Sequence, residues 1–314
     1  MGAQSFVPRY PAVQRPRLVV AFLVLAALAA LAAAAAAPST GARYAVTGDV
    51  DLMRPKDAGH QAAPKSGVNM TYHGGPIMPT AVEKSIFWGS GWATYTGDKV
   101  TGIDSFYTGF SGSHYAATNT EYTGSNGRAG STTTYQGHIV DTSTASGGSR
   151  ASTILAEVAK QVAAGNIVLD TSGNGYYPVY TDVPRGSAGY CAWHSAGTIN
   201  GIRVQFAFFW RLDGDPGCDP GDTTTGHSQG LAALGNVSAH ELSEAMTDPA
   251  SPGGWYDRQG AENGDKCAWA FNVPSVGFSN GSAWMVQGEW SNAAYTAGTG
   301  YPNLSGQKGC LDGH

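Results

Sequence analysis

The stretch AHELSEAMTDP, residues 239–249, decides how this chain is interpreted. It begins like H-E-x-x-H, the zinc-binding helix of metalloproteases, but Glu244 stands where that motif has its second histidine. On a helix, His240 and Glu244 lie one turn apart on one face, with Glu241 beside that face. Zinc accepts carboxylate oxygen as well as imidazole nitrogen, so we expect a helix that carries two zinc ligands, His240 and Glu244.

The stretch GAENGDKC, residues 260–267, contains the expected third ligand, Glu262. In thermolysin-like metalloproteases, which residues 240–248 resemble, the third ligand is a glutamate at a similar distance along the chain from the first histidine. The motif then makes Glu241 the catalytic base that polarises a metal-bound water. One imidazole and two carboxylates would neutralise Zn²⁺, so this ion would be a weaker Lewis acid than one held by two histidines.

Three further polar residues are candidates for supporting roles. His194, in CAWHS at residues 191–195, is a possible acid or oxyanion donor, or the missing histidine if a strand brings it to the helix. Asp265 is expected to assist from the second shell of the metal. Asp248 continues the helical ridge one turn beyond Glu244, although it could simply end the helix.

The other candidates also have ordinary structural interpretations. Glu241 and Glu244 could form the solvated face of a surface helix. Glu262 and Asp265 lie in a Gly/Asn-rich segment, where acidic residues commonly form turns. His194 could be a hydrogen-bonded structural histidine. Their common order and spacing favour the metal site over these separate explanations.

The first forty residues predict export. Arg9, Arg15 and Arg17 precede an uncharged apolar run at residues 18–37, which is followed by Pro, Ser and Thr. This pattern is typical of a secretory signal peptide, here residues 1–37. The run is also long enough to serve as an uncleaved membrane anchor. We favour cleavage and therefore expect a secreted protein that has no membrane association afterwards.

Composition and cysteine content agree with an extracellular chain. The formal net charge is −5 and there is no basic run, which argues against a nucleic-acid partner. The four cysteines form an even set, for which two disulfides are the default in an exported protein. Of three possible pairings we favour the sequential one, because each bond closes a loop around a segment that needs fixing: Cys191–Cys218 and Cys267–Cys310.

Periodicity predicts an α+β protein with a zincin-like mixed sheet, an active-site helix and a loop-rich C-terminal part. Residues 38–67 lack any period and are expected to be a flexible lead-in to a single domain, residues 68–314. Helices are expected at residues 98–110, 150–166 and 228–247. Strands are expected at residues 81–88, 133–141, 167–170, 176–182, 203–210 and 283–290, with 203–210 in the centre of the sheet.

Several blocks together resemble the EXORDIUM, or phosphate-induced protein, family of secreted proteins best known from plant cell walls. The blocks are MTYHGGPIM, FWGSGW, YCAWHS, AHELSEAMTDPASPGGWYD, AENGDKCAW and MVQGEWS. The resemblance implies that Glu244 is the family's own residue and that the helix is a maintained zincin variant. Plant members have more cysteines near YCAWHS and a glycine-rich run after DKC, so their disulfide pattern could differ.

Two functions follow from these patterns. The first is a zinc metallohydrolase that acts on an extracellular or cell-wall peptide. The second is a non-catalytic extracellular or cell-wall factor in growth or nutrient response. Such a factor would bind a glycan or a receptor through exposed aromatic residues such as Trp92, Trp255 and Tyr256.

Overall fold

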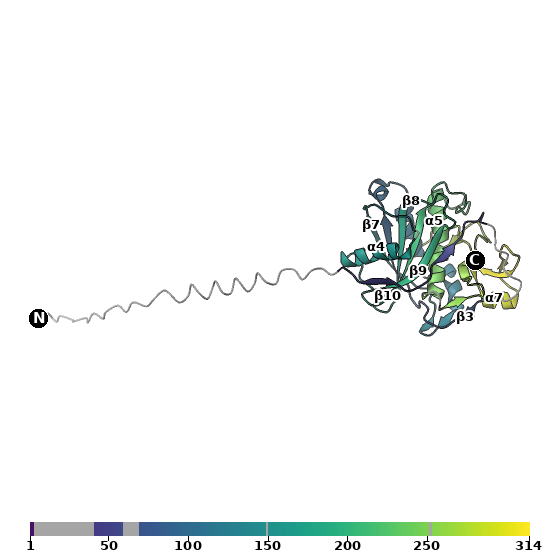
Figure 1. Ribbon diagram of the computed structural model, residues 1–314, viewed down its shortest axis with the longest axis horizontal. Helices are drawn as coiled ribbons and strands as arrows, with labels where there is room; N and C mark the ends of the chain where they lie inside the picture. The colour runs from purple at the N-terminus through teal and green to yellow at the C-terminus, as the bar shows by residue number, and fades with distance from the viewer. Residues whose placement is uncertain (3–40, 59–68, 149, 251–252) are drawn as a thin grey trace. The chain divides into compact units, whose positions relative to one another are not determined.

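In the computed structural model the chain divides into two units, Met1–Thr40 and Gly41–His314. The predicted signal peptide lies almost entirely outside the described residues. Among the helices that are described, none combines the length and apolar character that a membrane crossing requires. The residues described are 1–2, 41–58, 69–148, 150–250 and 253–314 (Figure 1).

The second unit is built on a seven-stranded mixed sheet (Figure 1). The strand order is β1-β9-β10-β8-β4-β7, and β2 also pairs with β9. Strands β7, β4, β8 and β10 are mutually parallel, whereas β9 is antiparallel to β10, β1 and β2. The strands are β1 (Tyr44–Val46), β2 (Asp51–Met53), β4 (Val82–Trp88), β7 (Thr134–Asp141), β8 (Gly175–Pro184), β9 (Ala192–Ile199) and β10 (Ile202–Arg211).

Three helices cover the sheet: α2 (Lys99–Phe110), α4 (Ala151–Ala163) and α5 (Gln229–Thr247). Helix α2 joins β4 to β7, and α4 joins β7 to β8. Alternate side chains of a strand point to opposite faces. On β9, His194 contacts α5, whereas Gly197 lies against Leu155 of α4, so α4 and α5 cover opposite faces. The α+β class is therefore confirmed, although two parallel crossover units, which the sequence pattern did not predict, lie within it.

The structure confirms some of the other predicted helices and strands and contradicts others. All three helices are present, and β10 lies between β8 and β9 in the sheet, as expected. Residues 167–170 form no strand, and residues 283–290 contain two short strands, β13 and β14, instead of one. The smaller elements are β3 (Thr71–Tyr72), η1 (Ser90–Thr94), α3 (His114–Ala117), η2 (Thr118–Glu121), β5 (Thr123–Gly124), β6 (Gly127–Arg128), β11 (Trp255–Tyr256), α6 (Asn263–Lys266), β12 (Val276–Gly277), β13 (Ala283–Trp284), β14 (Glu289–Trp290), α7 (Asn292–Ala297), β15 (Tyr301–Pro302) and β16 (Lys308–Leu311).

The predicted flexible lead-in is wrong for the part of it that is described, residues 41–58. Both β1 and β2 lie in this segment and pair with the edge of β9 that β10 leaves open. Met53 of β2 is fully buried in the core. Two three-residue strands carry no detectable period, so their order depends on the backbone groups of β9 and not on a local pattern. Residues 59–68 lie outside the described residues.

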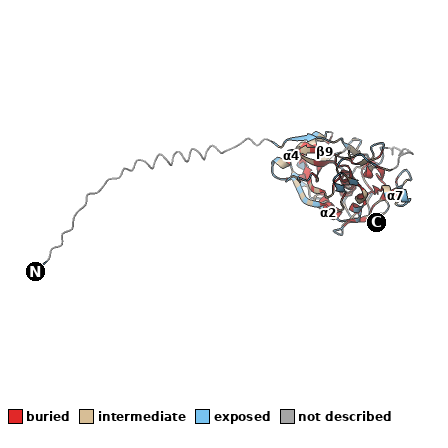
Figure 2. Ribbon diagram, turned by 90° about the horizontal axis from the view of Figure 1, so that it is seen from below, coloured by how far each residue is buried: buried red, intermediate tan, exposed pale blue. Residues whose placement is uncertain are grey.

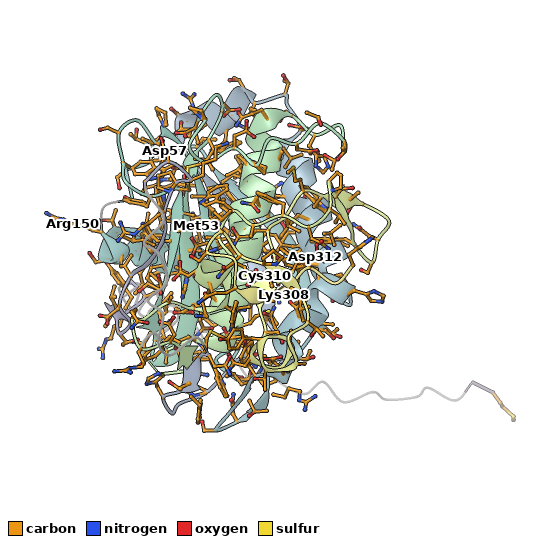
Figure 3. All side chains as sticks on the ribbon, turned by 90° about the vertical axis from the view of Figure 1, so that its right-hand side faces the viewer. Met53, Asp57, Arg150, Lys308, Cys310 and Asp312 are labelled. Atoms are coloured by element: carbon orange, nitrogen blue, oxygen red, sulfur yellow. A yellow bond between two sulfur atoms is a disulfide. The ribbon has the colours of Figure 1, made fainter. Side chains whose placement is uncertain are left out.

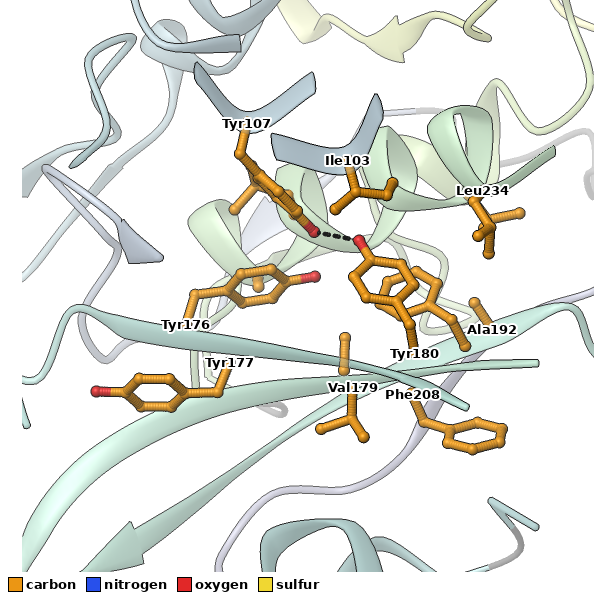
Figure 4. Packing of buried hydrophobic residues seen from close by; sticks show 14 of the residues in the cluster. Ile103, Tyr107, Tyr176, Tyr177, Val179, Tyr180, Ala192, Phe208 and Leu234 are labelled. Atoms are coloured by element: carbon orange, nitrogen blue, oxygen red, sulfur yellow. Dashed lines mark hydrogen bonds between the residues drawn. The ribbon is translucent and has the colours of Figure 1, made fainter. Parts of the chain in front are cut away.

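Aromatic residues fill the layer between the sheet and the helices α2 and α5. Figure 2 shows the buried residues concentrated inside the fold, and Figure 4 shows Tyr176 and Tyr180 of β8 facing Tyr107 of α2. The Tyr107 and Tyr180 hydroxyls are 2.8 Å apart, and the Tyr180 hydroxyl is 2.7 Å from Ser238 Oγ of α5. These hydrogen bonds connect all three elements through the interior.

Both predicted disulfides are confirmed, Cys191–Cys218 and Cys267–Cys310. The first connects the residue before β9 to the segment that leads into α5. The second connects the C-terminal end of α6 to β16, where Cys310 is labelled in Figure 3. Each bond therefore fixes a segment adjacent to the residues of the predicted metal site.

Candidate metal centre

Helix α5 is buried along almost its whole length. It begins at the N-cap Ser228, whose side chain accepts a hydrogen bond from Leu231 N at 3.2 Å, and it ends before Pro249. Every residue from position 230 to 247 is buried, including the ionisable residues. The alternative of a solvated face is therefore wrong, because a helix surrounded on all sides belongs to the core.

His240 and Glu244 face each other one turn apart, as the sequence predicted. His240 Nε2 lies 3.1 Å from Glu244 Oε2, and both side chains have no solvent exposure. Neither of these two atoms has a hydrogen-bond partner among the described residues. The other oxygen, Glu244 Oε1, accepts a hydrogen bond from Asp265 N at 2.9 Å. One carboxylate oxygen is thus held by the backbone, while the second is directed at an imidazole nitrogen.

Gln287, between β13 and β14, contacts the Nδ1 side of the His240 ring. Its Nε2 lies 3.0 Å from His240 Nδ1 and donates to Gly264 O at 2.8 Å. Metal ligation through Nε2 places the ring proton on Nδ1. The Gln287 amide would then have to turn its oxygen towards the ring and give up two hydrogen bonds, the one that its Oε1 accepts from Trp269 N and the one that its Nε2 donates to Gly264 O. Gln287 is a site residue that the sequence analysis missed.

His194 lies at the same cluster, carried there by β9. Its Nδ1 is 3.1 Å from Glu241 Oε2 and 3.5 Å from Glu244 Oε2. Its Nε2 lies 3.8 Å from Glu262 Oε1 and has no hydrogen-bond partner in the part of the chain that the structure describes. Burial lowers the pKa of His194 to about 4, opposed by the nearby charge of Asp51 and assisted by that of His240. The ring is therefore neutral at pH 7 and one nitrogen is available as a ligand.

The segment from Glu262 to Asp265 closes over the end of the cluster. Glu262 is the N-cap of the short helix α6, and its backbone N–H donates to Asp265 Oδ2 at 3.3 Å. Asp265 Oδ1 lies 3.9 Å from His240 Nε2, and its side chain is 25% exposed. A Cβ atom at Gly264 would lie 2.8 Å from His240 Nδ1 and 2.9 Å from Glu244 Oε1. The close approach of this turn to α5 therefore requires glycine at position 264.

Asp51 is the second site residue that sequence reasoning missed. The register of β2 places Asp51 directly opposite His194 of β9. Residues opposite each other in a ladder project to the same face, which brings this carboxylate from the predicted lead-in into the cluster. A three-residue strand in a segment without periodicity offers no signal for this placement.

The possible ligand atoms form three overlapping groups, and within each group all atoms lie within 4.8 Å of one another. Glu244 belongs to every group. The predicted ligand set is divided, because Asp265 accompanies His240 and Glu244, whereas Glu262 lies with Glu244 and Asp51. Asp248 lies at the end of α5, where its Oδ1 accepts a hydrogen bond from Gly254 N at 2.8 Å.

Four carboxyl groups of the cluster have raised pKa values for the same physical reasons. Burial raises the pKa of each well above its ordinary value, and the other carboxylates of the cluster raise it further. In the described part of the chain, their close charge contacts are with His194 and His240 and none is with lysine or arginine. The four are Glu241, Glu244, Glu262 and Asp265. A bound cation would favour the ionised form of these carboxyl groups and so lower their pKa values.

The donor atoms fit a small divalent ion. Tetrahedral zinc with bonds of about 2.0–2.1 Å places neighbouring ligand atoms roughly 3.3 Å apart. Here His240 Nε2 lies 3.1 Å from Glu244 Oε2 and 3.9 Å from Asp265 Oδ1, which brackets that spacing. Imidazole nitrogen and carboxylate oxygen are both suitable zinc donors. The cluster is therefore a candidate metal centre by chemistry and by spacing.

Comparison of the chain with protein-family models, with curated proteins and with solved structures finds no match. The similarity to the EXORDIUM family and to thermolysin-like helices therefore stays a prediction. The class that the fold and the site define is an α+β protein with two disulfides and a buried histidine–carboxylate cluster able to accommodate a metal ion.

Proposed function

We propose that this chain is a secreted, EXORDIUM-like metalloprotein whose centre hydrolyses an extracellular or cell-wall peptide. The observation that carries the proposal is the pair formed by His240 Nε2 and Glu244 Oε2, which lie 3.1 Å apart in the core and have no hydrogen-bond partner within the described ranges. A bound divalent cation would satisfy both atoms and offset the buried negative charge around them.

Zinc is the metal that we propose, because imidazole nitrogen accompanies the carboxylates. His240 and Glu244 would hold it, together with Asp265 or Glu262 from the turn that closes the site. When bound, zinc polarises a carbonyl group and lowers the pKa of a water molecule. The chain's own residues must then position the peptide and transfer the proton.

Glu241 is the proposed catalytic base. Its Oε1 is buried without a hydrogen-bond partner, and its Oε2 lies 3.1 Å from His194 Nδ1. A proton on that nitrogen would fix the carboxylate by donating to Oε2. Glu241 then accepts a proton from the attacking water as the oxygen bonds to the peptide carbon. It returns the proton to the amine that leaves when the C–N bond breaks.

Access to the centre is proposed from the side of Asp265. His240, Glu241 and Glu244 have no exposure, whereas the Asp265 side chain is 25% exposed. The half-buried Tyr256 of β11 lies near enough to Asp248 and Glu262 that, after burial, their charges raise its pKa. A peptide approaching between Asp265 and β11 would therefore come nearest to the buried ligands.

The second candidate function is non-catalytic binding of a glycan or receptor, and an aromatic surface favours it. Tyr72 of β3 is 41% exposed and its ring centre lies 5.6 Å from that of Trp255. His73 and Tyr256 stack with ring centres 3.6 Å apart. Sugars and aromatic peptides bind to such rings. Trp92 does not belong to this surface, because it is 7% exposed and its Nε1 donates to a backbone carbonyl.

Metal analysis combined with peptide hydrolysis tests the proposal. The zinc-treated mature chain is compared with Glu241→Gln and with Glu83→Gln, a control in a different buried carboxyl on β4. We expect zinc in all three proteins and a loss of hydrolysis of about 100-fold or more in Glu241→Gln alone. Zinc without hydrolysis in the unaltered chain would select the binding function, and absence of zinc would overturn the metalloprotein.

A further inference from the structure

We propose that the cluster holds two divalent metal ions bridged by Glu244, an inference that rests on the proposed metal-binding function. The first ion would be held by His240, Glu244 and Asp265. The second would be held by His194, Asp51, Glu262 and the same Glu244. The motif on α5 alone predicts one ion, whereas the structure brings together more ligands than one ion uses.

His194 has the arrangement of a metal ligand that is oriented by a carboxylate. Its Nδ1 lies 3.1 Å from Glu241 Oε2, so a proton on Nδ1 would be donated to that oxygen. The lone pair then lies on Nε2, which has no hydrogen-bond partner and is 3.8 Å from Glu262 Oε1. Metal-bound histidines commonly donate their second N–H to a carboxylate in this way. His194 is therefore prepared to bind an ion on the Glu262 side.

Asp51 completes the second set of ligands. It stands opposite His194 in the β2–β9 ladder, and its carboxylate lies within 4.8 Å of ligand atoms from Glu244 and Glu262. These three carboxylates come from β2, from α5 and from the residue before α6. Three separate elements thus converge on one point, beside the nitrogen of His194 that has no partner.

Glu244 connects the group that contains His240 and Asp265 to the group that contains Asp51 and Glu262. Its Oε2 lies 3.1 Å from His240 Nε2. In two-metal centres the ions are about 3.5–4 Å apart, a separation that a shared carboxylate can span. Glu244 replaces the histidine of the related zinc motif, and a carboxylate can bridge two ions where a neutral imidazole cannot.

Charge balance also favours two ions. Four carboxylates would act as ligands and the two imidazoles are neutral donors, so two divalent cations balance the ligand charge. A single ion would leave two of the four carboxyl groups without a cation, in a cluster where Glu244 and Glu262 are 0% and 1% exposed. Glu241 stays outside both ligand sets as the partner of His194.

Counting the ions tests the inference directly. The mature full chain is saturated with zinc, freed of excess metal and measured by native mass spectrometry and elemental analysis. We expect two zinc ions per chain. One ion per chain would overturn the dinuclear centre but leave the proposed function intact, and none would overturn both.

Two variants test which residues hold each ion. Asp51→Asn and Asp265→Asn are each expected to bind one zinc ion in place of two, because each removes a ligand of a different ion. Asp49→Asn, an exposed residue near Asp51, is the control that retains two. Circular dichroism identifies any variant that fails to fold. A folded Asp51→Asn variant that still binds two ions would overturn the assignment of the second set.

Manganese provides a readout that needs no variant. Two Mn²⁺ ions that share Glu244 are expected to give an exchange-coupled electron paramagnetic resonance spectrum in the unaltered chain. A spectrum of two isolated Mn²⁺ ions would overturn the bridge.

Discussion

Helix α5 contacts two buried polar regions that differ in how their polar atoms are paired. On one side, Ser238 continues the hydroxyl chain of Tyr180 and Tyr107, with separations of 2.7 and 2.8 Å. On the other side, His240 and Glu244 belong to a cluster of carboxylates and imidazoles. A hydroxyl group both donates and accepts, so Tyr107, Tyr180 and Ser238 pair with one another, whereas an ionised carboxylate only accepts. The second region is therefore the one at which we propose a bound cation.

Removal of the metal ion is expected to have the largest effect, because it would leave the carboxylate cluster, and not the hydroxyl chain, without its cation. A ligand present at a thousand times its Kd stabilises the folded chain by about 4 kcal/mol. We therefore expect a chelator to lower the Tm of the zinc-bound chain by roughly 8–16 °C, measured by differential scanning calorimetry. An unchanged Tm after complete removal of zinc would show that the acidic cluster is stable without a cation.

The substitution Glu244→Gln removes the ligand that all three groups share. We expect zinc affinity to fall by more than about 100-fold, which exceeds the usual effect of changes outside the ligand shell. Calorimetric titration against a competing chelator measures the change. Glu83→Gln, which alters a buried carboxyl in the other region, should leave affinity as it is. Equal losses in the two variants would mean that Glu244 acts only through the fold.

Gly264→Ala tests the position of the turn that carries Glu262 and Asp265, because it moves this turn without changing a ligand. The new Cβ would lie 2.8 Å from His240 Nδ1 and 2.9 Å from Glu244 Oε1, so the turn or the ligands must shift. We expect zinc affinity to fall by about 10- to 100-fold, measured by the same titration. Gly277→Ala is the matched control, since a Cβ there meets nothing within 4 Å. Unchanged affinity in Gly264→Ala would contradict the close packing of this turn.

Glu83→Gln alters a carboxyl group close to the hydroxyl chain, where, besides burial, its charge raises the pKa of Tyr107 and Tyr180. It has the smallest expected effect. Glu83 is fully buried, and burial raises its pKa well above the ordinary value of 4.5, although Thr133 lowers it slightly by hydrogen bonding. A raised carboxyl pKa means that the unaltered chain loses stability as the pH rises above about 4.5. The variant should therefore be more stable at pH 7 by on the order of 1 kcal/mol.

The gain should disappear below about pH 4.5, where the carboxyl group is protonated in both the folded and the unfolded chain. Urea unfolding at pH 4 and at pH 7 measures it. A gain of the same size at both pH values would show that it does not come from the ionisation of Glu83.

Much of α5 could be predicted from the sequence, because its signals are local. The helical spacing of the apolar residues and the stop at Pro249 lie within the helix or next to it, and they place His240, Glu241 and Glu244 on one helix. Both disulfides were also predicted, since four cysteines allow only three pairings. These predictions needed no knowledge of distant contacts.

The rest of the site depends on long-range pairing and could not be predicted. Asp51 reaches the cluster only because β2 pairs with the open edge of β9, and nothing within three residues indicates that pairing. The spacing between His240 and Glu262 indicated which segment approaches the helix. It did not indicate which carboxylate of that segment lies near His240. The backbone of the turn brings Asp265 towards His240 and directs Glu262 towards Asp51. Only the folded turn, with glycine at position 264, distinguishes these two carboxylates.

The Cys267–Cys310 bond has a consequence for the order of events in biosynthesis. Cys267 directly follows α6, so this bond anchors the turn that carries Glu262 and Asp265 to the last strand of the chain. In a compartment that keeps thiols reduced, the anchor cannot form and the turn is held only by its weaker contacts. If the cluster binds metal as proposed, oxidation of this cysteine pair is expected to precede metal uptake.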